Sequence, residues 1–338
     1  MSSLCPPSNL VFCFPFRYVY IRSDTHIFPT ISGLHTIPLR PNDKFASGYL
    51  GYYLNSRAYH DQLLPLIQGI KVSSISKRAV QNTDISYPTD LAEQAAIGKY
   101  FIGLDTLITL HQQKLEQIKE YKKGMLQKMF PKKGETVPEV RFPGFEGDWE
   151  EKKVTELGKI YIGLVTTMTS HYTDHGALLI RNSDIKEGRF EFGDHPIYLD
   201  DIFAEQNASR KHRLGDVITV HTGDIGTSAI ITEKEVGSIG FATIVTRPDT
   251  EIITSEYLCA YLNTDTHKNF AMNISTGDGR NNYNLKDYYE CVILIPRLEE
   301  QKKISGFING LNNHITLYQR KLEQMKEYKK GLLQQMFV

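Results

Sequence analysis

Residues 114–130, KLEQIKEYKKGMLQKMF, decide how the chain is organised, because residues 321–337 repeat them as KLEQMKEYKKGLLQQMF. Over the longer windows 111–130 and 318–337, 15 of 20 positions are identical at an offset of 207. The likeness continues upstream at an offset of 207 or 208. There, Ser47, Tyr49, Leu50, Tyr53, Leu54, Asn55, Pro88, Glu93 and Gln94 match Ser255, Tyr257, Leu258, Tyr261, Leu262, Asn263, Pro296, Glu300 and Gln301. The chain is therefore two copies of one unit.

Each copy ends in a long helix whose apolar residues recur at intervals of four and three, the a/d pattern of a coiled coil. The two stripes have equal length and are interrupted at matching positions, by His111 and Lys122 in the first copy and by Tyr318 and Lys329 in the second. We therefore expect the stripes to pack on each other, with antiparallel helices in a pseudo-twofold arrangement. The predicted seam comprises Leu104, Ile108, Leu115, Ile118 and Met125 from the first helix and Leu311, Ile315, Leu322, Met325 and Leu332 from the second.

A connector and a globular region lie between the helices. Residues 131–148 hold three prolines and three glycines, which favours an ordered or semi-rigid connector over a helix. From Trp149 onward, short β-branched runs alternate with Gly, Asn and Asp, and a helix is expected from Ser255 to Leu262 with Ser255 as its cap. The expected strands are Ala177–Ile180, Asp216–Val220, Ala229–Thr232, Phe241–Thr246 and Cys291–Ile295. The fold class is α+β.

Length and net charge limit the kinds of partner that the chain can have. With 338 residues, the chain has room for two domains and their connectors. Lys and Arg together number 39, as do Asp and Glu, so no global field draws the molecule to nucleic acid or to an anionic membrane. A site for a polyanion must therefore be a local patch.

The four cysteines and the apolar stretches indicate a reduced, non-membrane setting. Cys5, Cys13, Cys259 and Cys291 show neither CxxC spacing nor a histidine at metal-ligand spacing. The apolar stretch 10–21 is broken by proline and arginine and is too short to span a bilayer, and no basic residue precedes it. We expect a soluble cytoplasmic protein with no membrane partner.

An ordered series of segments now identifies a family. The chain resembles the specificity subunit of a type I restriction-modification system from about residue 40 to its end, and the duplication at a fixed offset makes the series specific. The segments are RFPGFEGDWEEKKVTELG (141–158), LIRNSDIKEG (179–188), LGDVITVHTGDIG (214–226), TIVTRPDTEIITSEYLCAYLNT (243–264), GDGRNNYNLKDYYECVILIP (277–296) and EEQKKI (299–304).

The resemblance implies a non-catalytic DNA-binding protein. In that family, two target-recognition domains each read one half of a split double-stranded DNA sequence, and the repeated helices set the distance between them. The helices also dock two methyltransferase subunits, which bring S-adenosylmethionine, and through them the restriction subunit with its ATP and Mg. Two readers on a rigid spacer address half-sites at a fixed separation. No cofactor is expected in this chain itself.

The resemblance also implies domain boundaries and one departure. We expect a first target-recognition domain at 1–90, a spacer helix at 91–130, the connector at 131–148, a second and complete recognition domain at 149–296, and a second spacer helix at 297–338. Moving Arg141 back by 208 positions gives −67, and residues 1–35 reproduce neither LIRNSDIKEG nor HTGDIG. The first recognition domain is therefore expected to be truncated or rearranged, which puts reading of one half-site in doubt.

Two segments of the second domain offer groups for DNA. Residues 207–213 cluster basic and amide side chains, and residues 275–286 combine glycines with hydrogen-bond donors. A solvated charged turn and an ordinary polar loop are the competing interpretations. The candidate contacts are Arg181, Asn207, Ser209, Arg210, Lys211, Arg213, Arg280, Asn281, Asn282, Asn284 and Lys286.

Catalytic and metal sites are not expected. His221, Asp224 and Asp216 are close in sequence, but Gly223 and Gly226 suit a tight turn between strands, and the two aspartates stand where turn geometry favours Asp. His171 and His175 have zinc-ligand spacing for a helix, yet the threonines around them disfavour one. A methyltransferase cofactor loop with its base-holding motif, a nuclease carboxylate cluster with a lysine, and a P-loop are all absent from the sequence.

A second function class stays open at this point. Seven lysines against two glutamates lie between Lys114 and Lys133, where a solvated flank, DNA phosphates or an acidic partner are all compatible. The alternative to a specificity subunit is a non-catalytic coiled-coil adaptor or a recombination-reservoir fragment in which DNA binding is lost or confined to one half-site.

Overall fold

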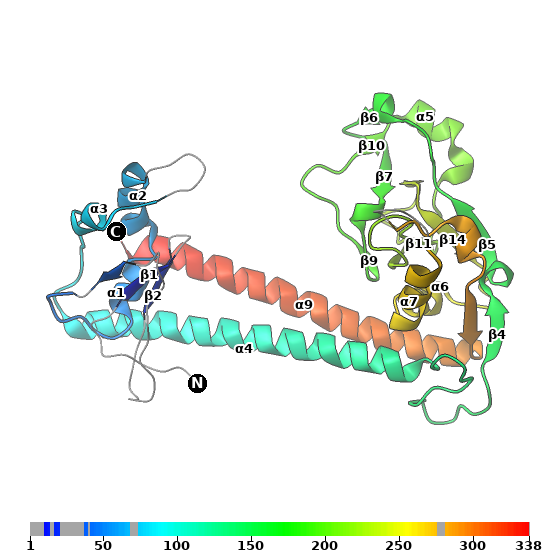
Figure 1. Ribbon diagram of the computed structural model, residues 1–338, viewed down its shortest axis with the longest axis horizontal. Helices are drawn as coiled ribbons and strands as arrows, with labels where there is room; N and C mark the ends of the chain where they lie inside the picture. The colour runs from blue at the N-terminus through cyan, green and yellow to red at the C-terminus, as the bar shows by residue number, and fades with distance from the viewer. Residues whose placement is uncertain are drawn as a thin grey trace. The chain divides into compact units, whose positions relative to one another are not determined.

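The computed structural model describes residues 10–13, 17–20, 37–39, 41–67, 74–275 and 281–337. Arg280 and most of segment 5–24 lie outside these ranges. The chain divides into two compact units, Met1–Glu116 with Thr316–Val338, and Gln117–Ile315. Two helices of 39 residues, α4 (Leu91–Met129) and α9 (Leu298–Met336), each contribute one part to each unit (Figure 1). Within the described ranges, no helix is both long and apolar enough to cross a membrane.

The first unit has a small aromatic core. Tyr49, Tyr53 and Phe101 are buried there around Phe337, which follows the end of α9. The side chains of Ser56 and Ser76 cap the helices that begin at Arg57 and Lys77 by accepting hydrogen bonds from backbone N–H groups in the first turn. Besides the long helices, the unit contains β1 (Leu10–Cys13), β2 (Arg17–Tyr20), β3 (Pro38–Leu39), α1 (Tyr49–Tyr53), α2 (Arg57–Leu63) and α3 (Lys77–Gln81), with strand order β2-β1-β3.

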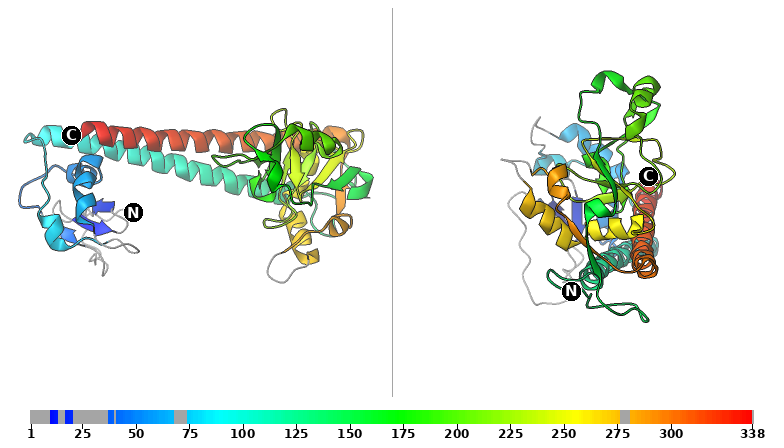
Figure 2. Two further views of the ribbon diagram at one scale, coloured as in Figure 1. Left: turned by 90° about the horizontal axis from the view of Figure 1, so that it is seen from above. Right: turned by 90° about the vertical axis from the view of Figure 1, so that its right-hand side faces the viewer.

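The second unit is a mixed α+β domain (Figure 2). Its strand orders are β12-β11-β14-β5, β13-β7-β10-β6, β15-β4 and β8-β9. The strands are β4 (Glu150–Lys153), β5 (Gly158–Ile162), β6 (Tyr172–Thr173), β7 (Ala177–Arg181), β8 (Ile185–Lys186), β9 (Arg189–Phe190), β10 (Tyr198–Leu199), β11 (Val217–Thr219), β12 (Ser228–Ile230), β13 (Ile239–Phe241), β14 (Ile244–Pro248) and β15 (Val292–Ile295). The short helices are α5 (Asp201–Gln206), α6 (Ser255–Leu262), α7 (Asp265–Ile274) and α8 (Leu285–Tyr288).

Helix α6 is the centre of this domain, since seven of its eight residues are buried. The sequence-based range for this helix is confirmed, but its cap is not: the Thr254 side chain accepts the hydrogen bond from Tyr257 N, and Ser255 Oγ donates to the Gly215 carbonyl at 2.7 Å. The strand predicted over 241–246 is in fact two strands, because the chain turns at Ala242, where φ is +49°.

The sequence repeat is also a repeat of contacts. Phe337 packs on Tyr49 and Tyr53 with ring centroids 5.6 and 5.8 Å apart. The matching Phe130 packs on Tyr257 and Tyr261 at 5.4 and 5.9 Å. In each unit, therefore, the phenylalanine that ends the helix of one copy meets the tyrosine pair of the other copy.

A buried glutamine is used in the same way in both copies. The Gln94 amide accepts from Ala46 N at 2.9 Å and donates to the Pro88 carbonyl at 2.7 Å. Gln301 accepts from Thr254 N and donates to the Pro296 carbonyl, both at 2.9 Å. Each glutamine ties the start of a long helix to the segment before it, which explains why the repeat keeps this polar residue in a buried position.

Of the ten residues in the predicted seam, three are buried (Leu115, Ile315 and Leu322) and seven are half-buried. The His111 and Tyr318 rings meet at 6.0 Å. The two lysine interruptions have separate partners. Lys122 pairs with Glu187 at 3.5 Å, and Lys329 pairs with Asp105 and lies over the Tyr52 ring, because an ammonium group near an apolar seam needs a carboxylate or aromatic partner.

We expect Leu115→Ala and Leu322→Ala each to lower the unfolding free energy by about 2–5 kcal/mol, because each removes a nearly inaccessible side chain and leaves a cavity. Urea denaturation of the full chain measures this. The matched controls are Leu110→Ala and Leu317→Ala, since these leucines lie on the same helices but are 54% and 60% exposed. Equal losses in the buried and exposed pairs would contradict the prediction.

Candidate nucleic-acid interface

Several strands of the second unit end at one edge. Strands β7 and β13 run parallel, with Arg181 opposite Phe241 at their ends. The end of β5, Ile162, and the end of β11, Thr219, both pair with Ile244 at the start of β14. The residues at or after the ends of β5, β7, β11 and β13 therefore gather at the same edge. We call this set, comprising Val165, Asn182, His221, Thr222, Phe241 and Ala242, the strand-end cluster.

Asn182 is the hub of the strand-end cluster. Its Oδ1 accepts a hydrogen bond from His221 N at 2.8 Å. Its Nδ2 donates to the carbonyl oxygens of Ala242 and Phe241 at 3.2 and 3.4 Å. One amide thus joins the ends of β7, β11 and β13. The sequence-based list of contacts included the neighbouring Arg181 and missed Asn182, whose only local signal is its position directly after a strand.

Ala242 carries backbone strain within the cluster. Among the described residues, it is the one non-glycine with a positive φ, a conformation that is unfavourable for a residue with a Cβ. Its N–H donates to the Leu164 carbonyl at 2.9 Å, and Leu164 N donates to the Gly240 carbonyl at 2.8 Å. Strain of this kind persists only where the surroundings impose it, and it concentrates at functional sites.

The loop around Asn282 closes the cluster from the other side. Thr222 Oγ1 donates to Asn282 Oδ1 at 2.9 Å, and the His221 ring nitrogen Nδ1 lies 2.7 Å from Thr222 Oγ1. Tyr283 N donates to the His221 carbonyl at 2.9 Å. Burial lowers the pKa of His221, so its ring is neutral at pH 7 and offers one donor and one acceptor. Three of the segments that carry the family resemblance therefore converge here.

The basic turn 207–213 is largely occupied by internal bonds. The Arg210 guanidinium donates to the Ile162 carbonyl at 2.7 Å, and Lys211 pairs with Glu205 at 2.6 Å. The Asn207 amide donates to the Phe203 carbonyl at 2.9 Å. Ser209 and Arg213 are exposed. Of this segment, Ser209 and Arg213 are best placed to meet an external ligand.

A buried ion pair holds the basic turn, and sequence reasoning missed it. Asp216 is fully buried and accepts two hydrogen bonds from Arg247, at 2.7 and 2.8 Å, and a third from Arg213 N at 2.8 Å. The Tyr161 ring has Arg247 and Arg210 each 5.7 Å from its centroid. The hydrogen bonds that Arg247 donates to Asp216 raise the pKa of Arg247 above its ordinary value. This arrangement fixes the direction in which the turn leaves the sheet.

The remaining predicted contacts are divided between internal and exposed positions. Arg181 forms a two-point pair with Asp184 at 2.8 and 3.0 Å. Asn284 caps α8 together with Asp287. Asn281 and Lys286 are exposed, and Arg280 lies outside the described residues. Arg181 and Asn284 therefore have structural partners that the sequence did not reveal.

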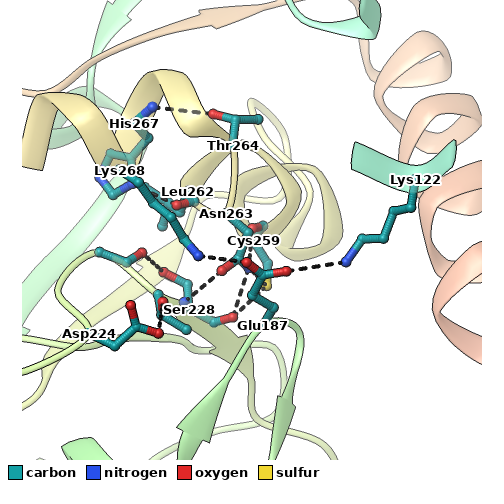
Figure 3. A network of polar contacts seen from close by, with 12 residues as sticks. Lys122, Glu187, Asp224, Ser228, Cys259, Leu262, Asn263, Thr264, His267 and Lys268 are labelled. Atoms are coloured by element: carbon teal, nitrogen blue, oxygen red, sulfur yellow. Dashed lines mark hydrogen bonds and ion pairs between the residues drawn. The ribbon is translucent and has the colours of Figure 1, made fainter. Parts of the chain in front are cut away.

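Figure 3 shows how the domain is joined to α4 within the second unit. The Glu187 carboxylate lies between two ammonium groups, with Lys268 at 2.6 Å and Lys122 at 3.5 Å. These two cations lower the pKa of Glu187 against the opposing effect of its burial. Beside it, Asn263 exchanges hydrogen bonds with the Ser228 backbone at 2.8 and 3.0 Å. A loop of the domain is thereby attached to the long helix.

Charge restricts where DNA can approach this domain. Residues 149–296 contain 14 Lys and Arg against 22 Asp and Glu, although the whole chain is neutral. A domain with this excess of acidic groups repels a polyanion over most of its surface. A DNA contact therefore needs a patch whose carboxylates are absent or already paired, as Asp184 is with Arg181.

The residues considered for catalysis and for zinc have separate partners. Asp216 binds Arg247, the Asp224 carboxylate accepts from Thr227 Oγ1, and His221 contacts Thr222. His171 is bonded to Asp200 and stacks on Phe203 with ring centroids 4.1 Å apart, and His175 contacts Asp174. In the part of the chain that the structure describes, no three potential metal ligands lie together.

We expect the stability of the fold to fall as the pH drops from about 6.5 to about 4. Burial lowers the pKa of both His212 and His267 from 6.5 to about 4, so the unfolded chain binds protons that the folded chain does not. Each histidine then removes up to ~1.4 kcal/mol of unfolding free energy per pH unit in this window, and none above it. Urea denaturation at several pH values measures the slope. His212→Gln should flatten it, whereas the exposed His195→Gln should leave it unchanged.

Comparison with known proteins gives consistent matches. The model of the family described as "Type I restriction modification DNA specificity domain" matches residues 146–327. Two curated relatives from Methanocaldococcus jannaschii are similar. The first, provisionally named as the type I restriction enzyme MjaX specificity subunit, is 24% identical over 90% of this chain and 70% of its own length. The type I restriction enzyme MjaVIII specificity subunit is 22% identical over 79% of this chain and 64% of its own length.

Two solved structures share the fold. A chain from a study of the assembly and conformational transition of the type I R-M system has a TM-score of 0.61 at 18% identity, covering 97% of this chain and 83% of that one. The type I restriction-modification S subunit from M. genitalium has a TM-score of 0.63 at 12% identity, covering 99% and 84%. These structures therefore share the mixed helix-and-sheet architecture at sequence identities of only 18% and 12%.

Proposed function

The chain belongs to the type I restriction-modification DNA specificity family, and from this premise we propose how its parts divide the work. It is a specificity subunit, the component that gives such a system its DNA sequence recognition, and it is not itself catalytic. The adaptor alternative is not favoured, because the family match covers 146–327 and so includes the whole globular region between the long helices.

We propose that residues 149–296 form a complete target-recognition domain that reads one half-site. The observation that carries this is the strand-end cluster, in which side-chain amide and hydroxyl groups join segments distant in the sequence beside an exposed aromatic ring. Base edges are read by polar side chains and by apolar contacts, whereas phosphates are held mainly by cations. Of the predicted contacts that the structure describes, Ser209, Arg213, Asn281 and Lys286 have exposed side chains, and Arg213 and Lys286 suit phosphates.

We propose that α4 and α9 form an antiparallel coiled-coil spacer and relate the two copies by a pseudo-twofold axis. In the first unit, Tyr100 contacts Tyr328 and His111 contacts Tyr318, and this order of contacts supports opposite helix directions there. In the second unit, Tyr121 contacts Phe307. The exchanged Phe130 and Phe337 contacts also support a twofold relation. Residues 1–90 would then hold the first recognition domain, 131–148 the connector and 297–338 the second spacer.

The proposed partners follow from the same role. Double-stranded DNA is the ligand, and the spacer helices dock two methyltransferase subunits and, through them, the restriction subunit. Exposed apolar side chains on the helices, such as Leu107, Leu110 and Leu317, offer surface for this docking. S-adenosylmethionine would be held by the methyltransferase subunits, and ATP and Mg would serve restriction.

A selection experiment tests the reading function. The full chain, alone and together with its methyltransferase subunits, is incubated with DNA duplexes that have a randomised centre, and the bound duplexes are sequenced. We expect the complex to enrich one short motif or two motifs at a fixed spacing, and the chain alone to transfer no methyl group. Enrichment of no sequence by either sample would overturn the proposal.

A further inference from the structure

The strand-end cluster contains one exposed aromatic side chain, Phe241, that is not part of a hydrophobic core. Phe241 ends β13, is 38% exposed and belongs to none of the buried apolar clusters of the described residues. Val165, which follows its bridge partner Leu164, is 67% exposed. An aromatic and an aliphatic side chain thus face solvent beside Asn182 and Ala242.

The backbone that presents Phe241 is held in one conformation. The Asn182 amide donates to the carbonyls of both Phe241 and Ala242, and the Ala242 N–H donates to the Leu164 carbonyl. The positive φ of Ala242 requires such support, since an L-residue rarely adopts it unaided. A strained turn fixed by a side-chain amide and carrying an exposed ring is a feature expected where a group must be positioned for a ligand.

The chemistry of this position favours a base over a phosphate. Within the described strand-end cluster no side chain is a free cation, and the neighbouring Arg181 is already paired with Asp184. The ring is also more than half covered, so it cannot enter between stacked base pairs as a protruding wedge does. A partly covered apolar face suits instead the methyl group that thymine displays in the major groove.

We propose that Phe241 reads a thymine methyl group in the half-site recognised by residues 149–296, with Asn182 as the residue that positions it. This inference rests on the proposed function and adds to it the base and the chemical group that are read. Asn182 acts through the Phe241–Ala242 backbone and is not required to touch DNA.

The test uses the duplex that the wild-type complex selects. Each thymine is replaced in turn by deoxyuridine, which removes only the methyl group, and the Kd of the complex is measured. We expect one position at which deoxyuridine weakens wild-type binding by about fivefold to tenfold. Phe241→Ala should bind the thymine duplex more weakly by a similar factor and be indifferent to deoxyuridine there. Val236→Ala, which truncates another exposed apolar side chain, should behave as wild type.

Two further variants separate positioning from folding. Asn182→Ala should lose the thymine preference at that position while keeping wild-type affinity for unrelated DNA. Ala242→Gly should retain the preference, because glycine adopts the positive φ without strain. If the wild type selects a motif but no thymine is sensitive to loss of its methyl group, or if Phe241→Ala discriminates as the wild type does, this inference fails alone. If no motif is selected, the proposed function fails first.

Discussion

Replacement of Asp216 by alanine should lower the unfolding free energy by about 3–5 kcal/mol, because it leaves the Arg247 guanidinium largely buried without its partner. The same change removes the acceptor of the Arg213 N–H. Turn 207–213 should therefore loosen, and sequence-specific binding should weaken together with stability. Urea denaturation measures the first effect and the selected duplex measures the second.

Two variants make the Asp216 result interpretable. Asp224→Ala removes a carboxylate that is exposed and bonded only locally to Thr227, so it should change stability by no more than about 1 kcal/mol. The double variant Asp216→Leu with Arg247→Met removes both charges and should be less destabilising than Asp216→Ala, because no buried charge is left unpaired. If Asp216→Ala were as stable as the wild type, the prediction would be wrong, and the Arg247 guanidinium would be hydrated by solvent in that variant.

Exchange of residues 149–296 for the equivalent domain of a relative should change the half-site read by this domain completely, while any motif read by residues 1–90, and its spacing from the first, stay as they were. The physical reason is that, under the proposed function, base contacts lie in the exchanged domain, whereas separation depends on the helices, which remain. Profiling the methylated sites of the assembled complex measures all three properties at once.

The result of the domain exchange shows which part of the chain recognises the DNA sequence. Retention of the original sequence would place the reader in residues 1–90 and overturn the assignment of 149–296. To preserve the attachment to the long helix, the exchanged domain should keep a carboxylate at the position of Glu187, since Lys122 pairs with it in the second unit. A matched chimeric protein without that carboxylate tests whether the attachment affects spacing more than sequence.

Much of the fold was predictable from local sequence patterns. The two long helices, the five expected strand regions and α6 were predictable, because periodicity and repetition express burial along a single element. The range 241–246 was the exception, where Ala242 breaks one predicted strand into two. Alanine has no turn signature of its own, so only the contacts made by Asn182 and Leu164 explain the break.

The candidate site was predicted less well, since composition shows which groups a segment carries but not which of them are already bonded. The sequence predicted Arg181, Lys211 and Arg210 as DNA contacts, but in the fold each has an internal partner. Asn182 followed a predicted strand and Phe241 began one, but neither position indicated a DNA contact, because their importance comes from strand ends that meet only in three dimensions.

Repetition and periodicity along the chain indicate a duplicated unit with two long helices and a mixed domain, and its segments resemble a specificity subunit. The folded structure is needed to learn that Phe130 of one copy packs on the tyrosines of the other, that Asp216 binds Arg247, and which polar groups remain available. The reason is physical: a repeat or a period depends on neighbours along the chain, whereas the bonding of a side chain depends on partners brought close by the path of the whole chain.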